Sequence, residues 1–281
     1  MEHNRPFVMS LAGLDPSAGA GLLADIKTFE ALNTYGLGVC TALTVQTDTQ
    51  FISAEWQSAT QIIAQAQPLL EKFPVQYCKI GIIKDAATML AVISAIRHIQ
   101  PDIKIILDPV LKASAGYVFH QDARLGVWKA VLEQVYLLTP NYHEALLLSG
   151  EADGAAAARV LATYCAVLLK GGHRADMPGT DSLFVQEEEK IRLQDYWPQS
   201  GRDDRLHIVP GMQEGSSVSI LDIPAGRQTV YPKHGSGCVL SAAVTAQLAA
   251  GVSLFKACIS AKLYTEKFLA SHSSLLGYHN S

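Results

Sequence analysis

Two glycines, a serine and a thiol stand together in the run Lys233-His-Gly-Ser-Gly-Cys-Val239. Gly235 and Gly237, on either side of Ser236, allow a sharp backbone turn, and the apolar run after Cys238 predicts a helix buried on most sides. The unpaired N–H groups at the start of such a helix can hold an anion such as a phosphoryl group. The same helix end is expected to lower the pKa of the Cys238 thiol, which makes Cys238 a candidate base. The alternative is a tight turn that serves close packing only, because a lone Gly-x-Gly motif has many structural uses.

Other polar clusters follow predicted strands elsewhere in the chain. Because the carboxyl ends of parallel strands meet at one edge of a sheet, we expect these clusters to form one composite site. A plain connection is the alternative for the first cluster, and helix capping is the alternative for Glu144, which stands three residues after Asn141. The clusters are the loop 13–21, the string 46–50 beginning with Gln46, Asp108, Asn141 with Glu144, and the stretch Lys170-Gly-Gly-His173.

The elements that would position these residues alternate along the chain. Short apolar runs at 7–12, 38–45, 77–83, 103–107, 135–138 and 166–173 predict buried strands, and amphipathic patterns at 22–32, 61–73 and 86–99 predict helices. Such alternation predicts an α/β fold with a mostly parallel sheet between layers of helices. The polar, turn-rich segment 187–217 predicts a hairpin with a surface excursion, and an active-site flap is the alternative. No linker is evident, so residues 1–281 are expected to form a single domain.

Composition narrows the function further. The chain has 281 residues, a hydrophobic content of 49% and a formal net charge of −4, without a cluster of Lys or Arg. These values predict a well-filled core and argue against nucleic acid or an anionic membrane as a partner. The five cysteines are scattered and odd in number. That pattern, with no signal peptide and no membrane-spanning run, predicts a cytoplasmic protein with core thiols rather than disulfides.

Taken together, several motifs resemble the hydroxymethylpyrimidine/phosphomethylpyrimidine kinases of thiamine biosynthesis, within the ribokinase-like superfamily that also contains pyridoxal kinases. The resemblance runs from about residue 7 to 270, and its first and last motifs are specific in combination. The motifs are Ala12-Gly-Leu-Asp-Pro-Ser-Ala-Gly-Ala-Gly21 and the helix start after it, Thr41-Ala-Leu-Thr-Val-Gln46, Lys79-Ile-Gly81, Leu107-Asp-Pro-Val110, Thr139-Pro-Asn141 with Glu144, Lys170-Gly-Gly-His173 and His234-Gly-Ser-Gly-Cys238.

This resemblance implies a ribokinase-like fold, a homo-oligomer, and ATP and Mg²⁺ as cofactors. It implies that the enzyme phosphorylates the alcohol of 4-amino-5-hydroxymethyl-2-methylpyrimidine and also its monophosphate. The implied roles are catalysis for Gly235, Ser236, Gly237 and Cys238; substrate binding for Gly13, Ala20, Asp25 and Gln46; nucleotide binding for Asn141, Glu144, Lys170, Gly171, Gly172 and His173; and magnesium binding for Asp108 and Glu144.

The sequence also departs from the family pattern. Leu14 and Ala18 stand where relatives often carry a hydroxyl residue and a glycine, and Ile82 replaces a common methionine. These positions adjoin the substrate pocket, so pyridoxal or pyridoxine kinase remains the nearest alternative activity. A non-catalytic small-molecule binder and a thiol redox protein are alternatives from other classes. The binder should lack the anion site or the carboxylates, and the redox protein should have a second cysteine near Cys238.

Overall fold

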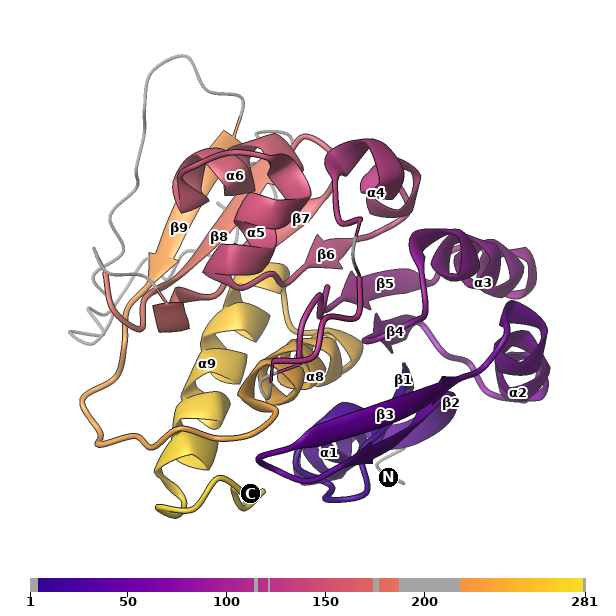
Figure 1. The fold of residues 1–281 in the computed structure, drawn as a ribbon, viewed down its shortest axis with the longest axis horizontal. Helices are drawn as coiled ribbons and strands as arrows, with labels where there is room; N and C mark the ends of the chain where they lie inside the picture. The colour runs from indigo at the N-terminus through magenta and orange to yellow at the C-terminus, as the bar shows by residue number, and fades with distance from the viewer. Residues whose placement is uncertain (1–4, 114–115, 121, 174–176, 187–217, 280–281) are drawn as a thin grey trace.

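One sheet runs through the molecule. The computed structural model describes residues 5–113, 116–120, 122–173, 177–186 and 218–279. Within this part of the chain nine strands form a sheet in the order β3-β2-β1-β4-β5-β6-β7-β8-β9 (Figure 1). The strands are β1 (Phe7–Leu14), β2 (Tyr35–Gln46), β3 (Phe51–Trp56), β4 (Tyr77–Ile80), β5 (Lys104–Leu107), β6 (Leu137–Leu138), β7 (Ala166–Leu169), β8 (Asp181–Gln186) and β9 (Val218–Ile223).

The middle of the sheet is parallel and its edges are antiparallel. Strands β2, β1, β4, β5, β6 and β7 run in one direction, while β3 pairs antiparallel with β2, and β8 and β9 add two antiparallel strands beyond β7. The loops that follow the parallel strands therefore emerge at a single edge. That edge is where α/β sheets bind their ligands.

Helices cover both faces of the sheet (Figure 1). Among the described helices, five pack on one face and share its largest apolar core, and three pack on the other. The first group is α2 (Ala59–Lys72), α3 (Ala86–Ile99), α4 (Leu125–Leu132), α5 (Tyr142–Ser149) and α6 (Gly154–Leu161), and the second is α1 (Gly21–Ala31), α8 (Ser236–Ala249) and α9 (Leu254–Ala270). A short 3₁₀ turn, η1, spans Gly171–His173.

The side chains of β7 show why this sandwich forms. Val167 and Leu169 contribute to the core under the first group of helices, whereas Ala166 and Leu168 contribute to the core under α8 and α9. Strand side chains alternate between faces, so a continuous apolar run is what a strand covered on both sides requires. Helix α8 is buried around almost its whole circumference from Val239 to Leu248, as its sequence predicted.

Most of the predicted elements are present, and the predicted sandwich is confirmed. The helix predicted at 86–99 is α3 with the same bounds. The edge strand β3 was not predicted, and the segment 187–217 lies outside the described residues. Strands β8 and β9 pair antiparallel on either side of that segment. None of the described helices is long and apolar enough to cross a membrane.

Candidate active site

The predicted clusters meet in one cleft of about 540 Å³ at the carboxyl edge of the parallel strands. Its walls come from the loops after β1, β4, β5, β6 and β7, from the end of β2, from the segment between β9 and α8, and from one face of α9. The predicted site residues that line it are Gly13, Ala20, Gln46, Asp108, Asn141, Glu144, Lys170, Gly172 and all four residues from Gly235 to Cys238.

The turn before α8 has the backbone that its glycines predicted. Gly235 caps the helix with φ of 74°, in the left-handed region that favours glycine. A Cβ atom at Gly235 would overlap the backbone of Gly19 and Ala20 in the loop after β1, so this loop and the turn are in direct contact. Because α8 starts at Ser236, the N–H groups of its first turn lack partners within the helix and can bind an anion.

The Cys238 thiol is not activated in the way its sequence position predicted. Burial raises the pKa of Cys238 to about 11, and the carboxylates of Asp108 and Asp25 add to the increase. Lys79 and a hydrogen bond from the Gly21 backbone act in the opposite direction and do not compensate. The prediction of a lowered pKa is therefore wrong for the ligand-free protein, in which Cys238 is a neutral thiol at pH 7.

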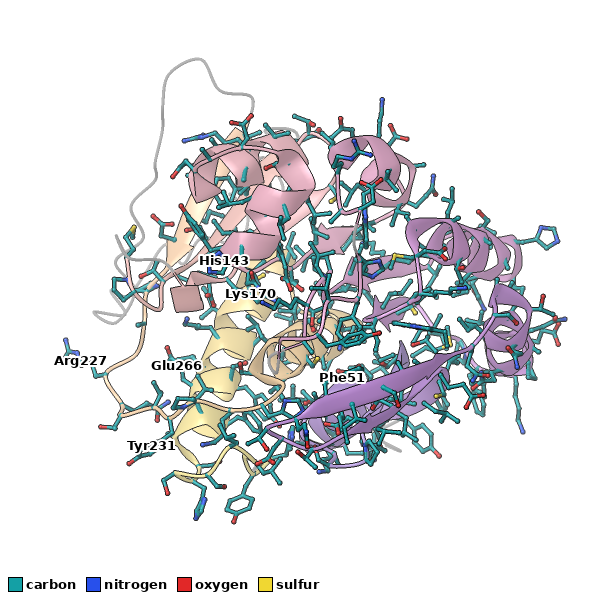
Figure 2. All side chains as sticks on the ribbon, in the orientation of Figure 1. Phe51, His143, Lys170, Arg227, Tyr231 and Glu266 are labelled. Carbon is teal, nitrogen blue, oxygen red and sulfur yellow. The ribbon has the colours of Figure 1, made fainter. Side chains whose placement is uncertain are left out.

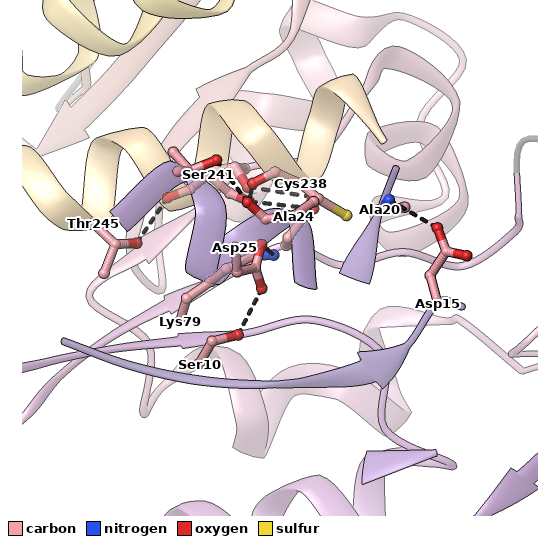
Figure 3. Close-up of polar contacts among 12 residues, drawn as sticks. Ser10, Asp15, Ala20, Ala24, Asp25, Lys79, Cys238, Ser241 and Thr245 are labelled. Atoms are coloured by element: carbon pink, nitrogen blue, oxygen red, sulfur yellow. Dashed lines mark hydrogen bonds and ion pairs between the residues drawn. The ribbon is translucent and has the colours of Figure 1, made fainter. Parts of the chain in front are cut away.

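Asp25 does not line the cleft; its carboxylate contacts Ser10 and Lys79 (Figure 3). Its side chain is fully buried, accepts a hydrogen bond from Ser10 at 2.6 Å and forms an ion pair with Lys79 at 2.5 Å. Lys79 is itself fully buried along its length yet contributes to the floor of the cleft. The expected substrate contact of Asp25 is thus replaced by a supporting role, since its carboxylate neutralises the lysine under Cys238.

Two carboxylates and a lysine form a second charged group in the cleft. The Nζ atom of Lys170 lies 2.8 Å from Asp108 Oδ1 and 3.8 Å from Glu144 Oε2. Ser241 donates a hydrogen bond to Asp108 Oδ2 at 3.3 Å. Burial opposes ionisation of Asp108, but Lys170 and Lys79 outweigh it and lower the pKa of this carboxyl. Burial, together with the nearby Asp108, raises the pKa of Glu144 to about 7.

Glu144 also caps a helix, as the alternative interpretation held. Asn141 Oδ1 accepts a hydrogen bond from the Glu144 N–H at 2.9 Å, and Glu144 Oε2 accepts one from the Asn141 N–H at 2.7 Å. This capping box starts α5. Because Glu144 and Asn141 both line the cleft, capping fixes their positions there and does not exclude a role in binding.

The residues of the 3₁₀ turn after β7, Gly171–His173, have different surroundings. Gly171 is buried and does not line the cleft; its N–H donates to Asp181 Oδ1 at 2.7 Å, and a Cβ atom there would overlap the backbone of Thr180. Gly172 lines the cleft. The side chain of His173 lies outside the described part of the structure. The predicted nucleotide contact of Gly171 is therefore replaced by a packing role.

Several residues of the cleft were not predicted from the sequence. Lys262 of α9 is mostly buried, donates to the Gly179 carbonyl and lies 3.1 Å from Asp181 Oδ2. Glu266, one helical turn later, accepts a hydrogen bond from the Gly226 N–H at 2.7 Å. Their four-residue spacing on α9 was the available signal, but nothing local indicated that this helix face closes a cleft.

A hydrogen bond joins the loop after β1 to the turn before α8. His234 Nε2 lies 3.0 Å from Asp15 Oδ2, and Asp15 also accepts hydrogen bonds from Ser17 and from the Ala20 N–H. Burial disfavours the charged form of Asp15, but the bonds from His234 and Ser17 outweigh it and lower the pKa of this carboxyl. The pair holds the first and last predicted motifs against each other at the cleft.

The donor set is compatible with magnesium. Among the described residues no group of three or more His, Cys, Asp or Glu side chains could hold a metal ion. Magnesium usually keeps several water ligands and is bound by one or two carboxylates together with substrate phosphates. Asp108 and Glu144, which share the Lys170 ammonium group, supply two carboxylates beside the anion-binding turn. Their number and chemistry suit an ion that arrives with a nucleotide.

Comparison with known proteins decides the family. The sequence model of the phosphomethylpyrimidine kinase family matches residues 15–202 and 216–281. The hydroxymethylpyrimidine/phosphomethylpyrimidine kinase of Rhizobium meliloti is 34% identical over 265 residues, which are 91% of this chain and 87% of that protein. The chain belongs to the phosphomethylpyrimidine kinase family. The enzyme of the same name from Escherichia coli is 29% identical over 85% of this chain and 81% of its own length.

Solved structures agree on the fold. The phosphomethylpyrimidine kinase of Clostridium difficile is 24% identical with a TM-score of 0.66, over 93% of this chain and 98% of that one. The pyridoxal kinase of Staphylococcus aureus in complex with ADP is also 24% identical, with a TM-score of 0.70 over 95% and 89% of the two chains. This likeness confirms the predicted ribokinase-like fold. As a member of the phosphomethylpyrimidine kinase family, the protein is a phosphotransferase, as its sequence predicted.

Proposed function

We propose that this family member transfers the γ-phosphoryl group of ATP, with Mg²⁺, to the alcohol of 4-amino-5-hydroxymethyl-2-methylpyrimidine, and then phosphorylates the resulting monophosphate, in thiamine biosynthesis. The observation that carries the proposal is that Gln46 and the turn from Gly235 to Cys238 line the same cleft. An amide that suits a pyrimidine edge thus shares one space with amides that suit a phosphoryl group.

Gln46 is held in one orientation, which favours a role in reading the substrate. Its Nε2 donates to Thr44 Oγ1 at 2.9 Å, and Thr44 donates in turn to the Leu14 carbonyl at 2.7 Å. An amide held in this way can accept a hydrogen bond from the amino group of the pyrimidine through its Oε1. The hydroxymethyl group of the same ring would then extend towards Cys238.

The phosphoryl group would be stabilised by fixed positive groups. Loose transition states of phosphoryl transfer need positioning and charge neutralisation more than early proton removal. The first N–H groups of α8 would hold the γ-phosphoryl oxygens, and Lys170, which lies beside Gly237, would stabilise negative charge as it develops. Gly172 and Asn141 line the part of the cleft assigned to the nucleotide.

Cys238 is the proposed acceptor of the hydroxyl proton. Its pKa is raised in the ligand-free protein, so the binding of substrates must lower this pKa before the thiol can act as a base. Asp108 is one cause of the rise. Asp108 and Glu144 would hold magnesium, whose positive charge would offset these carboxylates and the negative charge of the nucleotide phosphates. Lys79, fixed by Asp25 below Cys238, favours the thiolate throughout, so the proton is expected to move late in the transfer.

Phosphate-transfer assays with ATP and Mg²⁺ test the proposal directly. We expect turnover with the hydroxymethylpyrimidine and with its monophosphate, and turnover at least about tenfold lower in kcat/KM with pyridoxal, because a pocket whose polar groups match one heterocycle leaves them unpaired with another. Preferred turnover of pyridoxal would instead assign the enzyme to vitamin B6 salvage. A Cys238→Ala variant should lose most of kcat while its Kd for ATP stays within about twofold; near-normal kcat would exclude Cys238 as the base.

We also propose a cytoplasmic location and a homo-oligomeric state. The five cysteines are scattered and three of them are buried, which suits a reducing compartment. Strands β2 and β3 expose Leu43, Val45 and Ile52, and exposed apolar side chains grouped at a sheet edge are typical of subunit contacts. Light scattering of the purified protein measures the oligomeric state.

A further inference from the structure

Four aromatic side chains cluster at the end of the cleft that contains Gln46. This aromatic cluster consists of Phe51 and Trp56 from β3 and of Tyr117 and Phe119 from the loop after β5. The ring centroids of Phe51 and Tyr117 are 4.6 Å apart, those of Phe51 and Phe119 5.2 Å, and those of Trp56 and Phe119 6.0 Å. None of these side chains takes part in the phosphoryl-transfer chemistry described above.

The backbone places Phe119 beside the cleft through a small hairpin. The Ala113 N–H donates to the Tyr117 carbonyl at 2.7 Å, the Phe119 N–H donates to the Leu111 carbonyl at 2.9 Å, and Lys112 forms an antiparallel bridge with Val118. The hairpin begins three residues after Asp108. It therefore extends directly from the strand end that carries one of the active-site carboxylates.

Phe51 connects this hairpin to the residue that reads the substrate. In the β2–β3 ladder Phe51 is the register partner of Gln46, and its ring contacts both Tyr117 and Phe119. Figure 2 shows Phe51 between β3 and the loop that follows β5. Phe119, half-buried, lines the cleft together with Gln46 and Ile82. The cleft thus has an aromatic ring and an aliphatic side chain near the proposed hydrogen-bonding amide.

We propose that Phe119 is a specificity-determining residue that packs against the heterocycle of the substrate, and that Phe51 and Tyr117 position it. The inference rests on the proposed function and names one further residue of the same site. A flat heterocycle gains from contact with an aromatic ring in addition to apolar burial. Ile82 is branched and packs closely against Gly13, so an aromatic partner supplies contact area that Ile82 alone does not.

The test compares four variants in binding and turnover. Phe119→Ala should raise both the Kd for the pyrimidine alcohol, measured by calorimetry without nucleotide, and the KM for that alcohol by about tenfold. Phe119→Leu, which keeps apolar volume, should raise them by about threefold, and Tyr117→Ala by a similar factor. The KM for ATP should change less than about twofold in each variant, because the aromatic cluster lies at the pyrimidine end.

Tyr35→Ala is the matched control. Like Tyr117, Tyr35 is an exposed tyrosine with an aromatic neighbour, Phe7. It stands at the opposite end of β2 from Gln46. Its removal should leave both KM values unchanged. Thermal unfolding of each variant, followed by circular dichroism, identifies loss of the fold; Phe119→Leu decides the outcome if Phe119→Ala does not fold.

The outcomes separate this inference from the proposed function. If the unmodified enzyme neither binds nor phosphorylates the pyrimidine alcohol, the proposed function is wrong. If the unmodified enzyme does both, and folded Phe119 variants keep its Kd and KM for the alcohol, the inference about Phe119 is wrong. Equal increases in the KM for ATP and for the alcohol would also overturn it, because they would indicate a general loosening of the site.

Discussion

At the scale of single residues, the chemistry depends on how buried charges compensate one another. Lys79 is paired with Asp25, and Lys170 is paired with Asp108. A buried charge that loses its partner costs about 3–5 kcal/mol of stability, so each lysine is fixed in place by the need for neutrality. The charges of both ion pairs act on the Cys238 thiol. The ionisation of this thiol therefore responds to any ligand that changes the charge on either carboxylate.

Glu144 gives a prediction about pH. Burial and the nearby Asp108 raise its pKa to about 7, so below pH 7 the carboxyl is mostly protonated and binds a cation poorly, while above pH 7 it is ionised. With saturating Mg²⁺, kcat/KM for ATP should fall about five- to tenfold between pH 7 and pH 6. Steady-state kinetics from pH 5.5 to 8.5 measure the profile.

Glu144→Gln is the matched variant for this pH dependence. A glutamine amide oxygen can still accept the hydrogen bond from the Asn141 N–H that completes the capping box, so α5 should keep its start. The variant should have lower activity at pH 8 and no inflection near pH 7. The titration of the nucleotide itself is common to both proteins and cancels in the comparison. An unchanged inflection would assign it to a different group.

The sequence predicted which residues line the cleft better than it predicted their ion pairs and pKa values. Gln46, Asp108 and the turn at Gly235 line the cleft as expected, because polar residues after parallel strands share one edge. The ion pair between Asp25 and Lys79 could not be predicted from the sequence, because it joins α1 to β4 across the core. The pKa of Cys238 was mispredicted for a related reason: helix polarity is a local feature, whereas burial and the two carboxylates depend on the whole fold.

At the scale of elements, the start of α8 depends on its contact with the loop after β1. Gly235→Ala should destabilise the protein by about 2–5 kcal/mol, because the left-handed backbone is strained and the new Cβ atom overlaps backbone atoms of Gly19 and Ala20. The kcat should fall as well, since the first N–H groups of α8 would be displaced. Chemical denaturation and the transfer assay measure the two effects.

Gly251, two residues beyond the other end of α8, provides the control for backbone strain. It also has a positive φ, of 83°, but a Cβ atom there would meet nothing within 4 Å. Gly251→Ala should therefore cost only about 1–2 kcal/mol and leave kcat unchanged. Equal losses of stability in the two variants would mean that the contact between the turn and the loop contributes nothing.

Elements with strong periodicity were predicted well, and short ones were not. Helix α3 has the predicted bounds because its apolar positions repeat over four turns and Asp85 caps its start. Strand β3 has no fully buried residue, with three of its six residues exposed and three half-buried, and it lacks the apolar run used to recognise buried strands. The edge strands and the order of the nine strands are set by tertiary pairing, which one sequence does not specify.

At the scale of the whole molecule, the position of the cleft relative to the β8–β9 pair predicts what the segment 187–217 contributes. Asp181 pairs with Ile223 at one end of these strands, and Gln186 pairs with Val218 at the other. Asp181 lines the cleft, so the segment 187–217 is attached at the end that lies farther from it. The surface interpretation of the segment, with an active-site flap as its alternative, stays a prediction.

Replacing residues 187–217 with Asn-Gly tests that interpretation. This dipeptide forms two-residue turns between antiparallel strands, and Gln186 and Val218, which it would join, are register partners in such a pair of strands. The shortened protein should keep its fold and change both KM values by less than about twofold, since the lining of the cleft is retained. Circular dichroism verifies the fold before kinetics are compared. A rise of about tenfold or more in the KM for ATP, in a protein that unfolds cooperatively at an unchanged Tm, would show that the segment reaches the nucleotide. Because Asp181 lines the cleft at the opposite end of the β8–β9 pair, we expect the change of less than about twofold in both KM values.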